Sequence, residues 1–196
     1  MTGDKGIIQK YHLLLGSKSP RRKYLLQEAG FSFTELPVIE TEESFPETMD
    51  HNDVPVYLAK MKAEAYKKYI KPGTILVTAD TIVSLENEIL GKPSGYNEAR
   101  ELLLKLSGKC HRVISGVCLT SVDKQVVFNS ITDVWFKKLT SEETDYYLSA
   151  YKPFDKAGAY GIQEWIGYIG VERIEGSFYN VMGLPVQKLY TEICEF

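Results

Sequence analysis

The hydrophobic pattern near the start of the chain predicts a strand followed by a helix. An apolar run at 13–15 stops at Gly16, and apolar residues return at helical spacing after Pro20. Ser19 stands where an N-cap belongs and Pro20 where the first helical residue belongs, and Gly30 ends the helix. We therefore expect a strand that turns directly into a helix.

The remaining elements follow from the same kinds of pattern. Apolar residues at intervals of three and four predict helices at 53–69 and 97–106, a capping box from Thr140 to Glu143 opens a helix to about 150, and Pro185 starts a terminal helix. Apolar or alternating runs predict strands at 33–36 and 74–85, a short strand at 88–90, and a long hairpin of 111–122 and 125–137. Helices alternate with strands, and the hairpin makes the sheet mixed. We expect an α/β protein with one extended, twisted, mixed β-sheet and flanking helices.

The composition is that of an ordinary globular protein. The chain has 196 residues, of which 44% are hydrophobic and 25% charged. This length fits one domain or two small lobes, and no stretch resembles an interdomain linker. We expect an N-terminal extension at 1–10 and a single domain at 11–196, in which any two lobes share the sheet and the cleft between them forms the natural site.

Charge and cysteine content narrow the class of protein. The net charge is −3 and the isoelectric point is about 5.7, so binding to nucleic acid is unexpected. Three cysteines without a C-x-x-C pair argue against a disulfide framework and a zinc knuckle. No signal peptide or membrane-spanning run is recognisable. These features favour a cytoplasmic protein.

The first predicted helix start is a candidate anion site. Ser17, Ser19, Arg21 and Arg22 crowd around a helix N-terminus, where free N–H groups attract anions. The alternative is that Ser-Pro simply starts a helix and the two arginines face water.

Three further places carry candidate chemistry, each with a plain structural alternative. Asp80 puts one carboxylate into an apolar strand and needs a partner, either in a buried salt bridge or in a functional site. Lys92 lies in a tight turn, where its ammonium binds phosphate or is merely solvated. The acidic loop offers Glu40, Glu42 and Glu43 as ligands for a hard divalent cation, or forms a solvated surface.

Two segments late in the chain are unusual for plain loops. The segment 155–163 combines small residues with polar ends at Asp155, Lys156, Tyr160 and Gln163, as a loop shaped around a ligand does, although glycines also serve backbone conformation alone. The segment 176–185 places polar residues before a proline-started helix and is a second candidate to face an anion. The usual nucleotide-binding loops and the esterase nucleophile elbow are absent from the sequence.

Taken together, these motifs resemble those of the Maf family of nucleoside triphosphate pyrophosphatases. The resemblance spans nearly the whole chain and rests on the order and spacing of its motifs: Ser-Lys-Ser-Pro-Arg-Arg at 17–22, Leu-Ala-Lys-Met-Lys-Ala at 58–63, Ala-Asp-Thr at 79–81, Gly-Lys-Pro at 91–93, Leu-Ser-Gly-Lys-Cys-His at 106–111, Asp-Lys-Ala-Gly-Ala-Tyr-Gly-Ile-Gln at 155–163 and Val-Met-Gly-Leu-Pro at 181–185.

The resemblance implies an inosine-triphosphatase-like fold with a central cleft between two lobes. It implies hydrolysis between the α- and β-phosphates, giving a monophosphate and pyrophosphate, with a divalent metal, Mg²⁺ or Mn²⁺. By position in the motifs, Asp80 matches the proton acceptor and a metal ligand, and Glu43 lies in the metal-ligand region. The same matching assigns phosphate or substrate binding to Ser17, Arg21, Arg22, Lys62 and Lys92.

Three positions sort the family by substrate. Arg21, Thr81 and Gln163 match the residues of members that act on dTTP and UTP, where the 7-methyl-GTP branch has tryptophan, glutamine and glutamate. The Gln163 amide both donates and accepts hydrogen bonds, which suits a pyrimidine edge. The sequence departs from the family pattern at Glu164-Trp165, where relatives usually have glycine after Gly-Ile-Gln. The indole of Trp165 is bulky enough to reshape the base pocket.

The expected activity is therefore metal-assisted hydrolysis of dTTP and UTP, with modified pyrimidine nucleotides as further substrates. One alternative is a pyrophosphatase for 7-methyl-GTP or a broader set of modified nucleotides. Another, from a different class, is a non-enzymatic nucleic-acid-binding or septum-related regulatory protein. The resemblance also suggests a homodimer.

Overall fold

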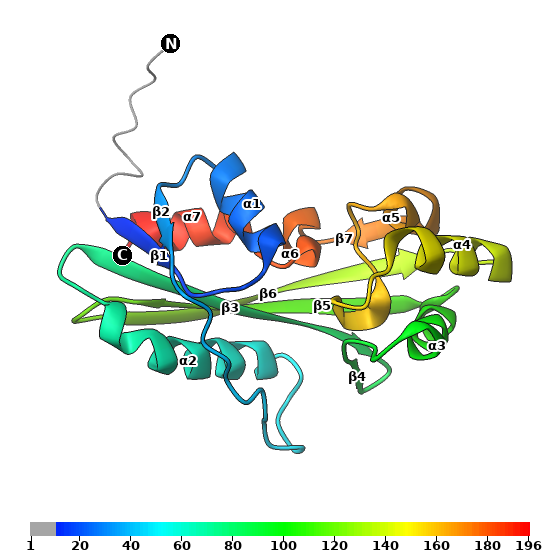
Figure 1. Ribbon diagram of the computed structural model, residues 1–196, viewed down its shortest axis with the longest axis horizontal. Helices are drawn as coiled ribbons and strands as arrows, with labels where there is room; N and C mark the ends of the chain where they lie inside the picture. The colour runs from blue at the N-terminus through cyan, green and yellow to red at the C-terminus, as the bar shows by residue number, and fades with distance from the viewer. Residues whose placement is uncertain (1–10) are drawn as a thin grey trace, which may run out of the picture. The chain divides into compact units, whose positions relative to one another are not determined.

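The computed structural model describes residues 11–196 (Figure 1), and the expected extension at 1–10 lies outside the described residues. The described strands are β1 (His12–Leu15), β2 (Phe33–Glu35), β3 (Thr74–Leu85), β4 (Glu88–Leu90), β5 (Cys110–Thr120), β6 (Gln125–Phe136) and β7 (Val171–Glu175). The described helices are α1 (Pro20–Glu28), α2 (Val54–Tyr66), α3 (Tyr96–Leu106), α4 (Ser141–Tyr151), α5 (Trp165–Gly170), α6 (Phe178–Met182) and α7 (Val186–Cys194), with short 3₁₀ helices η1 (Lys67–Tyr69) and η2 (Ala157–Ala159).

The strands form one mixed sheet, as the sequence predicts. Within the described residues it has seven strands in the order β2-β1-β3-β5-β6-β7, with β4 paired to β3. β1 runs parallel to both β2 and β3, whereas β4 is antiparallel to β3 and β7 is antiparallel to β6. The α/β class and the mixed sheet are confirmed.

The sequence pattern missed three short elements, β7, α5 and α6. β7 is exposed along most of its length, and it carries charged side chains at Glu172, Arg173 and Glu175. Such a strand pairs through its backbone at the edge of a sheet and shows no clear alternation of apolar residues. α5 and α6 are too short for the helical period to stand out.

The described chain divides into two compact units. Unit 1 comprises Ser115–Ser130, Gly183–Phe196 and the described part of Met1–Asp80, and unit 2 comprises Thr81–Ile114 and Ile131–Met182. Among the described residues, no helix is both long and apolar enough to cross a bilayer.

In unit 1, helices cover both faces of the strands. Figure 1 shows α2 on one face and α1 with α7 on the other. On the α2 side, Leu14, Leu76 and Cys118 pack with Ala59 and Tyr66 in a buried cluster. Alternation along β1 and β3 turns the neighbouring residues toward the opposite face, so this half of the sheet is buried on both sides.

In unit 2, α3 packs against α4 and against η2. α4 begins with the predicted capping box: the Thr140 hydroxyl accepts the Glu143 N–H, and the Glu143 carboxylate accepts the Thr140 N–H. One turn further on, Tyr147 is fully buried. The capping box therefore fixes the start of a helix that carries a tyrosine into the core of this unit.

Candidate functional site

The turn between β1 and α1 contains the predicted anion site. β1 ends at Leu15, α1 begins at Pro20, and Ser19 occupies the N-cap position with extended backbone, as predicted. The Ser19 hydroxyl, however, makes no capping hydrogen bond. Instead, Ser17 Oγ accepts hydrogen bonds from the Ser19 N–H and from Arg22 Nη1, each 3.2 Å long. Ser17 therefore organises this turn.

Gly16 allows the turn to lie close to α2 and β3. A Cβ at Gly16 would be 2.9 Å from Tyr66 Cδ2 and 3.0 Å from Thr78 Cγ2. These distances are tighter than ordinary side-chain contacts, so a larger residue would force the turn away from the sheet. The glycine thus keeps Ser17 near the elements that carry the other charged residues of unit 1.

Arg22 connects this turn to the loop before α7. Its Nε donates to the Gly183 carbonyl at 2.9 Å. Desolvation lowers the pKa of Arg22, while the negative charges of Asp80 and Glu43 oppose that shift and Arg21 adds to it. These four charged side chains therefore lie within electrostatic reach of one another. The Gly183 carbonyl thus accepts from the positively charged guanidinium of Arg22. This contact gives no support to the hypothesis of an anion site at 176–185.

Lys62 is the partner that Asp80 needs. Its Nζ lies 2.5 Å from Asp80 Oδ1 and 2.7 Å from Glu43 Oε1. The Lys62 and Asp80 side chains are only 15% and 13% exposed, whereas that of Glu43 is 42% exposed. One ammonium thus bridges the predicted proton acceptor and the predicted metal ligand.

The packing of α2 on β3 explains this contact. The Thr78 hydroxyl donates to the Ala59 carbonyl at 2.7 Å, which fixes the helix on the strand. Asp80 lies two residues beyond Thr78 and so shares its face of the sheet, and Lys62 lies three residues beyond Ala59 and so shares its face of the helix. The same register therefore brings the carboxylate and the ammonium together.

The donors of unit 1 suit both a phosphate chain and a cation. Arginine and lysine nitrogens and the N–H groups at the start of α1 attract phosphate oxygens. The described residues contain no group of three or more histidine, cysteine or acidic side chains arranged to hold a metal. Mg²⁺, however, commonly binds proteins through one or two carboxylates and takes its other ligands from water and substrate phosphates. Asp80 and Glu43 fit that smaller requirement.

Three predicted site residues belong to unit 2. Thr81 follows Asp80 directly in β3, Lys92 is exposed in the turn after β4, and Gln163 lies just before α5. The Gly91 carbonyl accepts the Gly158 N–H at 3.1 Å, so the turn that carries Lys92 is tied to the loop that leads to Gln163. The Gln163 Oε1 atom is buried and has no hydrogen-bond partner among the described residues.

The other polar side chains of the loop 155–163 have partners inside unit 2. The Lys156 ammonium lies 2.7 Å from Asp155 Oδ1 and 3.2 Å from Glu164 Oε1. The buried Tyr160 hydroxyl is 2.7 Å from His111 Nε2, and desolvation lowers the pKa of His111 to about 4. These contacts give Lys156 and Tyr160 partners within the unit, and the hypothesis that they face a ligand stays a prediction.

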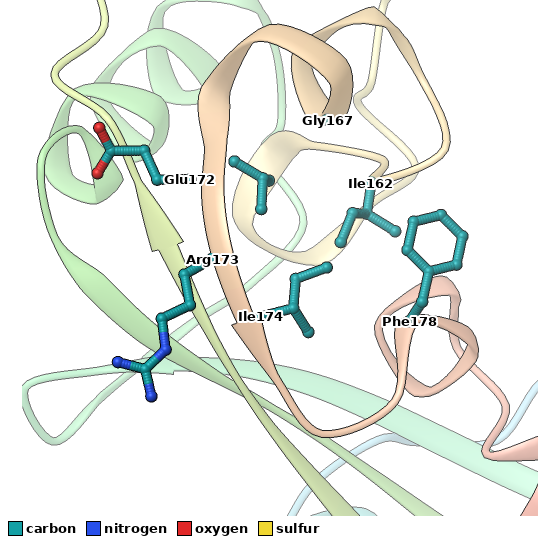
Figure 2. A pocket seen from close by; sticks show the side chains of 7 residues that line it. Ile162, Gly167, Glu172, Arg173, Ile174 and Phe178 are labelled. Atoms are coloured by element: carbon teal, nitrogen blue, oxygen red, sulfur yellow. The ribbon is translucent and has the colours of Figure 1, made fainter.

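Unit 2 also contains an open, mainly apolar pocket of about 270 Å³ (Figure 2). It is lined by Ile162, Gly167, Val171, Glu172, Arg173, Ile174 and Phe178. Figure 2 shows Ile162, Ile174 and Phe178 turned toward one another, while the charged ends of Glu172 and Arg173 extend away from them. None of the predicted site residues lines this pocket, so we do not assign it to the reaction.

Comparison with known proteins places this geometry in a family. The model of the Maf-like protein family matches residues 12–196. The chain belongs to the Maf family. It is 51% identical over 186 residues to a dTTP/UTP pyrophosphatase of Phocaeicola vulgatus, an alignment that covers 95% of this chain and 96% of the relative. It is 50% identical over 188 residues to a dTTP/UTP pyrophosphatase of Bacteroides thetaiotaomicron, with 96% and 97% covered.

Among solved structures, similarity is found to a HAM1 protein from Coxiella burnetii, with a TM-score of 0.49 and 14% identity over 95% of this chain and 100% of that one. The Maf resemblance derived from the sequence is confirmed by the family match and by the curated relatives.

In this member of the Maf family, the structure groups the predicted residues by unit. Unit 1 contains Ser17, Arg21, Arg22, Glu43, Lys62 and Asp80, and unit 2 contains Thr81, Lys92 and Gln163. Sequence reasoning missed that Lys62 bridges two carboxylates and that Tyr147 and Lys156 both bind the carboxylate of Glu164, the residue after Gln163. The carboxylate of Asp80 within an apolar strand indicates that a cation lies nearby, but this signal alone does not identify Lys62.

Proposed function

We propose that this protein hydrolyses dTTP and UTP between the α- and β-phosphates, releasing the nucleoside monophosphate and pyrophosphate. The observation that carries the proposal is the Lys62 ammonium held between Asp80 and Glu43, with Arg22 in electrostatic reach. The substrate choice is supported by the names of relatives that share about half of the sequence over nearly the whole chain.

In this proposal the cations of unit 1 neutralise the phosphate chain. Cleavage of a triphosphate develops negative charge on the leaving pyrophosphate, and preorganised donors stabilise that charge. Arg21, Arg22 and Lys62 supply the positive charge, and Ser17 holds the Arg22 guanidinium in place. In unit 2, Lys92 provides a further ammonium for a phosphate.

Asp80 acts as the proton acceptor for the attacking water. Among the described residues its carboxylate is hydrogen-bonded to Lys62 alone, through Oδ1. A carboxylate has about four acceptor sites, so Asp80 retains capacity to take a hydrogen bond from water. Lys62 fixes the direction in which the remaining lone pairs point.

Asp80 and Glu43 are the residues that would hold a divalent metal, Mg²⁺ or Mn²⁺. When bound there, the ion polarises the phosphate oxygens and neutralises part of their charge. The two carboxylates share one lysine, so a bound cation and the Lys62 ammonium compete for the same oxygens. Phosphate oxygens offer Lys62 alternative partners.

Gln163, Thr81 and Arg21 are assigned to substrate choice. The buried Oε1 of Gln163, which has no partner within residues 11–196, supports this role, because a buried acceptor without a partner carries a cost that a ligand donor removes. The two residues that depart from the family pattern have partners of their own: the Glu164 carboxylate binds Lys156 and Tyr147, and the Trp165 ring packs against Tyr146 with centroids 4.8 Å apart.

A nucleotide panel tests the proposal. Purified protein is incubated with dTTP, UTP, CTP, 7-methyl-GTP and methylated pyrimidine triphosphates, with Mg²⁺ and separately with Mn²⁺, and pyrophosphate is measured. We expect release from dTTP and UTP above that from 7-methyl-GTP. A preference for 7-methyl-GTP would move the protein to the alternative substrate class, and no release from any nucleotide would overturn the proposal.

The cellular setting and assembly are further parts of the proposal. The three cysteines are free, which suits a reducing cytoplasm. We also propose a homodimer, and light scattering coupled to gel filtration distinguishes it from a monomer.

A further inference from the structure

A single phenol in unit 2 holds both ends of the turn that contains Gln163. The Tyr147 hydroxyl accepts the Gly161 N–H at 3.0 Å and donates to Glu164 Oε2. The Glu164 N–H in turn donates to the Gly161 carbonyl at 2.9 Å. The residues on either side of Ile162 and Gln163 are therefore fixed to one another and to α4.

The second oxygen of the Glu164 carboxylate is held by Lys156. The Glu164 Oε1 atom lies 3.2 Å from the Lys156 ammonium, and the two side chains are only 19% and 10% exposed. Gly161 leaves room for this carboxylate, since a Cβ there would lie 2.8 Å from Glu164 Cδ. We refer to Tyr147, Lys156 and Glu164 as the brace.

The brace suits a role in geometry better than one in stability. Ion pairs that are taken out of water gain little over well-packed apolar residues, because their attraction is offset by lost hydration. Hydrogen bonds, in contrast, fix direction. Here they fix the backbone on both sides of Gln163, whose buried Oε1 has no partner in the described part of the chain.

We propose that the brace positions the Gln163 amide for recognition of the pyrimidine base, with Glu164 and Tyr147 as positioning residues that determine substrate preference rather than turnover. This inference rests on the proposed function. Glu164 makes no contact with substrate in it and acts through the backbone at 161–164.

Four variants test the brace. Tyr147→Phe removes the hydroxyl and keeps the ring, and Glu164→Ala removes the carboxylate. Glu164→Gln keeps an oxygen that accepts from Tyr147. Tyr151→Phe is the matched control, because it removes a hydroxyl from an exposed tyrosine of the same helix and keeps the ring that stacks on Tyr147. Each is assayed for kcat and KM with dTTP and with dGTP, and for thermal stability.

For Tyr147→Phe and Glu164→Ala we expect KM for dTTP to rise about tenfold, kcat to stay within about threefold, and the preference for dTTP over dGTP to fall. Glu164→Gln recovers most of the preference, and Tyr151→Phe matches the wild type. A purely structural role predicts equal losses with both nucleotides. That result, or an unchanged KM and preference in folded Tyr147→Phe, would overturn the inference.

Two readouts do not depend on turnover. Hydrogen exchange at 161–164 should be faster in Tyr147→Phe than in Tyr151→Phe, since the Gly161 N–H loses its acceptor. Calorimetric titration with dTMP and with dGMP should show the same loss of preference. If the wild type releases no pyrophosphate from dTTP or UTP, the proposed function fails. Separately, unchanged hydrogen exchange and an unchanged preference for dTMP in the variants would reject the positioning role of the brace.

Discussion

Among the described residues, each unit contains a lysine that lies between two carboxylates, and the two clusters differ in how many hydrogen bonds the carboxylates accept. In unit 1, Lys62 lies between Asp80 and Glu43, and the only described hydrogen bond of Asp80 is to Lys62. In unit 2, Lys156 lies between Asp155 and Glu164, and Glu164 is also bound by Tyr147.

The comparison shows that residue types alone do not distinguish a reactive cluster from a structural one. A carboxylate with spare lone pairs at a partly exposed position has capacity for water, phosphate-bound metal or a proton. A carboxylate with each oxygen bound to a different partner inside a unit has less of that capacity and is better suited to fixing geometry. We therefore expect the largest effect from a change in the reactive carboxylate of Asp80, and smaller effects from changes that concern stability or substrate preference.

The largest effect is expected for Asp80→Asn. The amide keeps the size of the side chain but is a poor proton acceptor, so kcat with dTTP should fall about 10³-fold while thermal unfolding remains cooperative. Steady-state kinetics with dTTP and UTP measure the loss, which should be equal for both nucleotides. Asp123→Asn, in the exposed β5–β6 turn, serves as the control. Activity within tenfold of wild type would remove Asp80 from its proposed role.

Acidification should weaken unit 2 through His111. Burial lowers the pKa of this histidine to about 4, so the folded state binds its proton less readily than the unfolded chain, whose pKa is near 6.5. Above about pH 6.5 the histidine is neutral in both the folded and the unfolded state. As the pH falls from there to about 4, the unfolded chain takes up the proton first, so the unfolding free energy falls by about 3 kcal/mol. Urea unfolding between pH 7.5 and 4 measures it.

The variant His111→Gln isolates this effect from the protonation of carboxylates, which both proteins share. Its unfolding free energy should fall less steeply with acid than that of the wild type. Parallel curves for the two proteins would show that His111 does not titrate as its burial requires.

A smaller effect is expected for Gln163→Glu, which replaces an amide that donates and accepts with a carboxylate that only accepts. We expect kcat/KM for dTTP to fall about 10- to 100-fold, without a matching fall for 7-methyl-GTP. Gln27→Glu, on the exposed side of α1, is the matched change in unit 1. Equal losses for both nucleotides would assign Gln163 to folding or to catalysis rather than to base choice.

The smallest effects concern the helix starts of the two units. Thr140→Ala removes a complete capping box and should lower the unfolding free energy by about 1 kcal/mol. Ser19→Ala removes a hydroxyl that caps nothing and should change it by less than about 0.5 kcal/mol. Chemical denaturation compares them. A larger loss for Ser19→Ala would show that its hydroxyl supports the helix after all.

Much of the fold follows from local sequence. The Thr140–Glu143 capping box, the Ser19-Pro20 helix start and the long hairpin all appear where the pattern places them, because each depends on residues close in sequence. Edge strand β7 does not, since its charged positions obscure the alternation on which strand prediction depends.

The candidate site is less predictable because its contacts are remote in sequence. The sequence indicates that Asp80 needs a cation, but only the packing of α2 on β3 selects Lys62. Likewise, the Tyr147 hydroxyl reaches Gly161 and Glu164 from another helix, and no local pattern indicates that contact. The family motifs identify the residues, and packing decides which of them meet.

The hydrogen bond from Thr78 to the Ala59 carbonyl limits which insertions and deletions this chain can tolerate. One residue added between Ala59 and Lys62 would turn the lysine by about 100° around α2, and one added between Thr78 and Asp80 would turn the carboxylate to the opposite face of the sheet. Related chains can therefore vary in length in the acidic loop, whereas the spacings 59–62 and 78–80 must stay constant for the cluster to form.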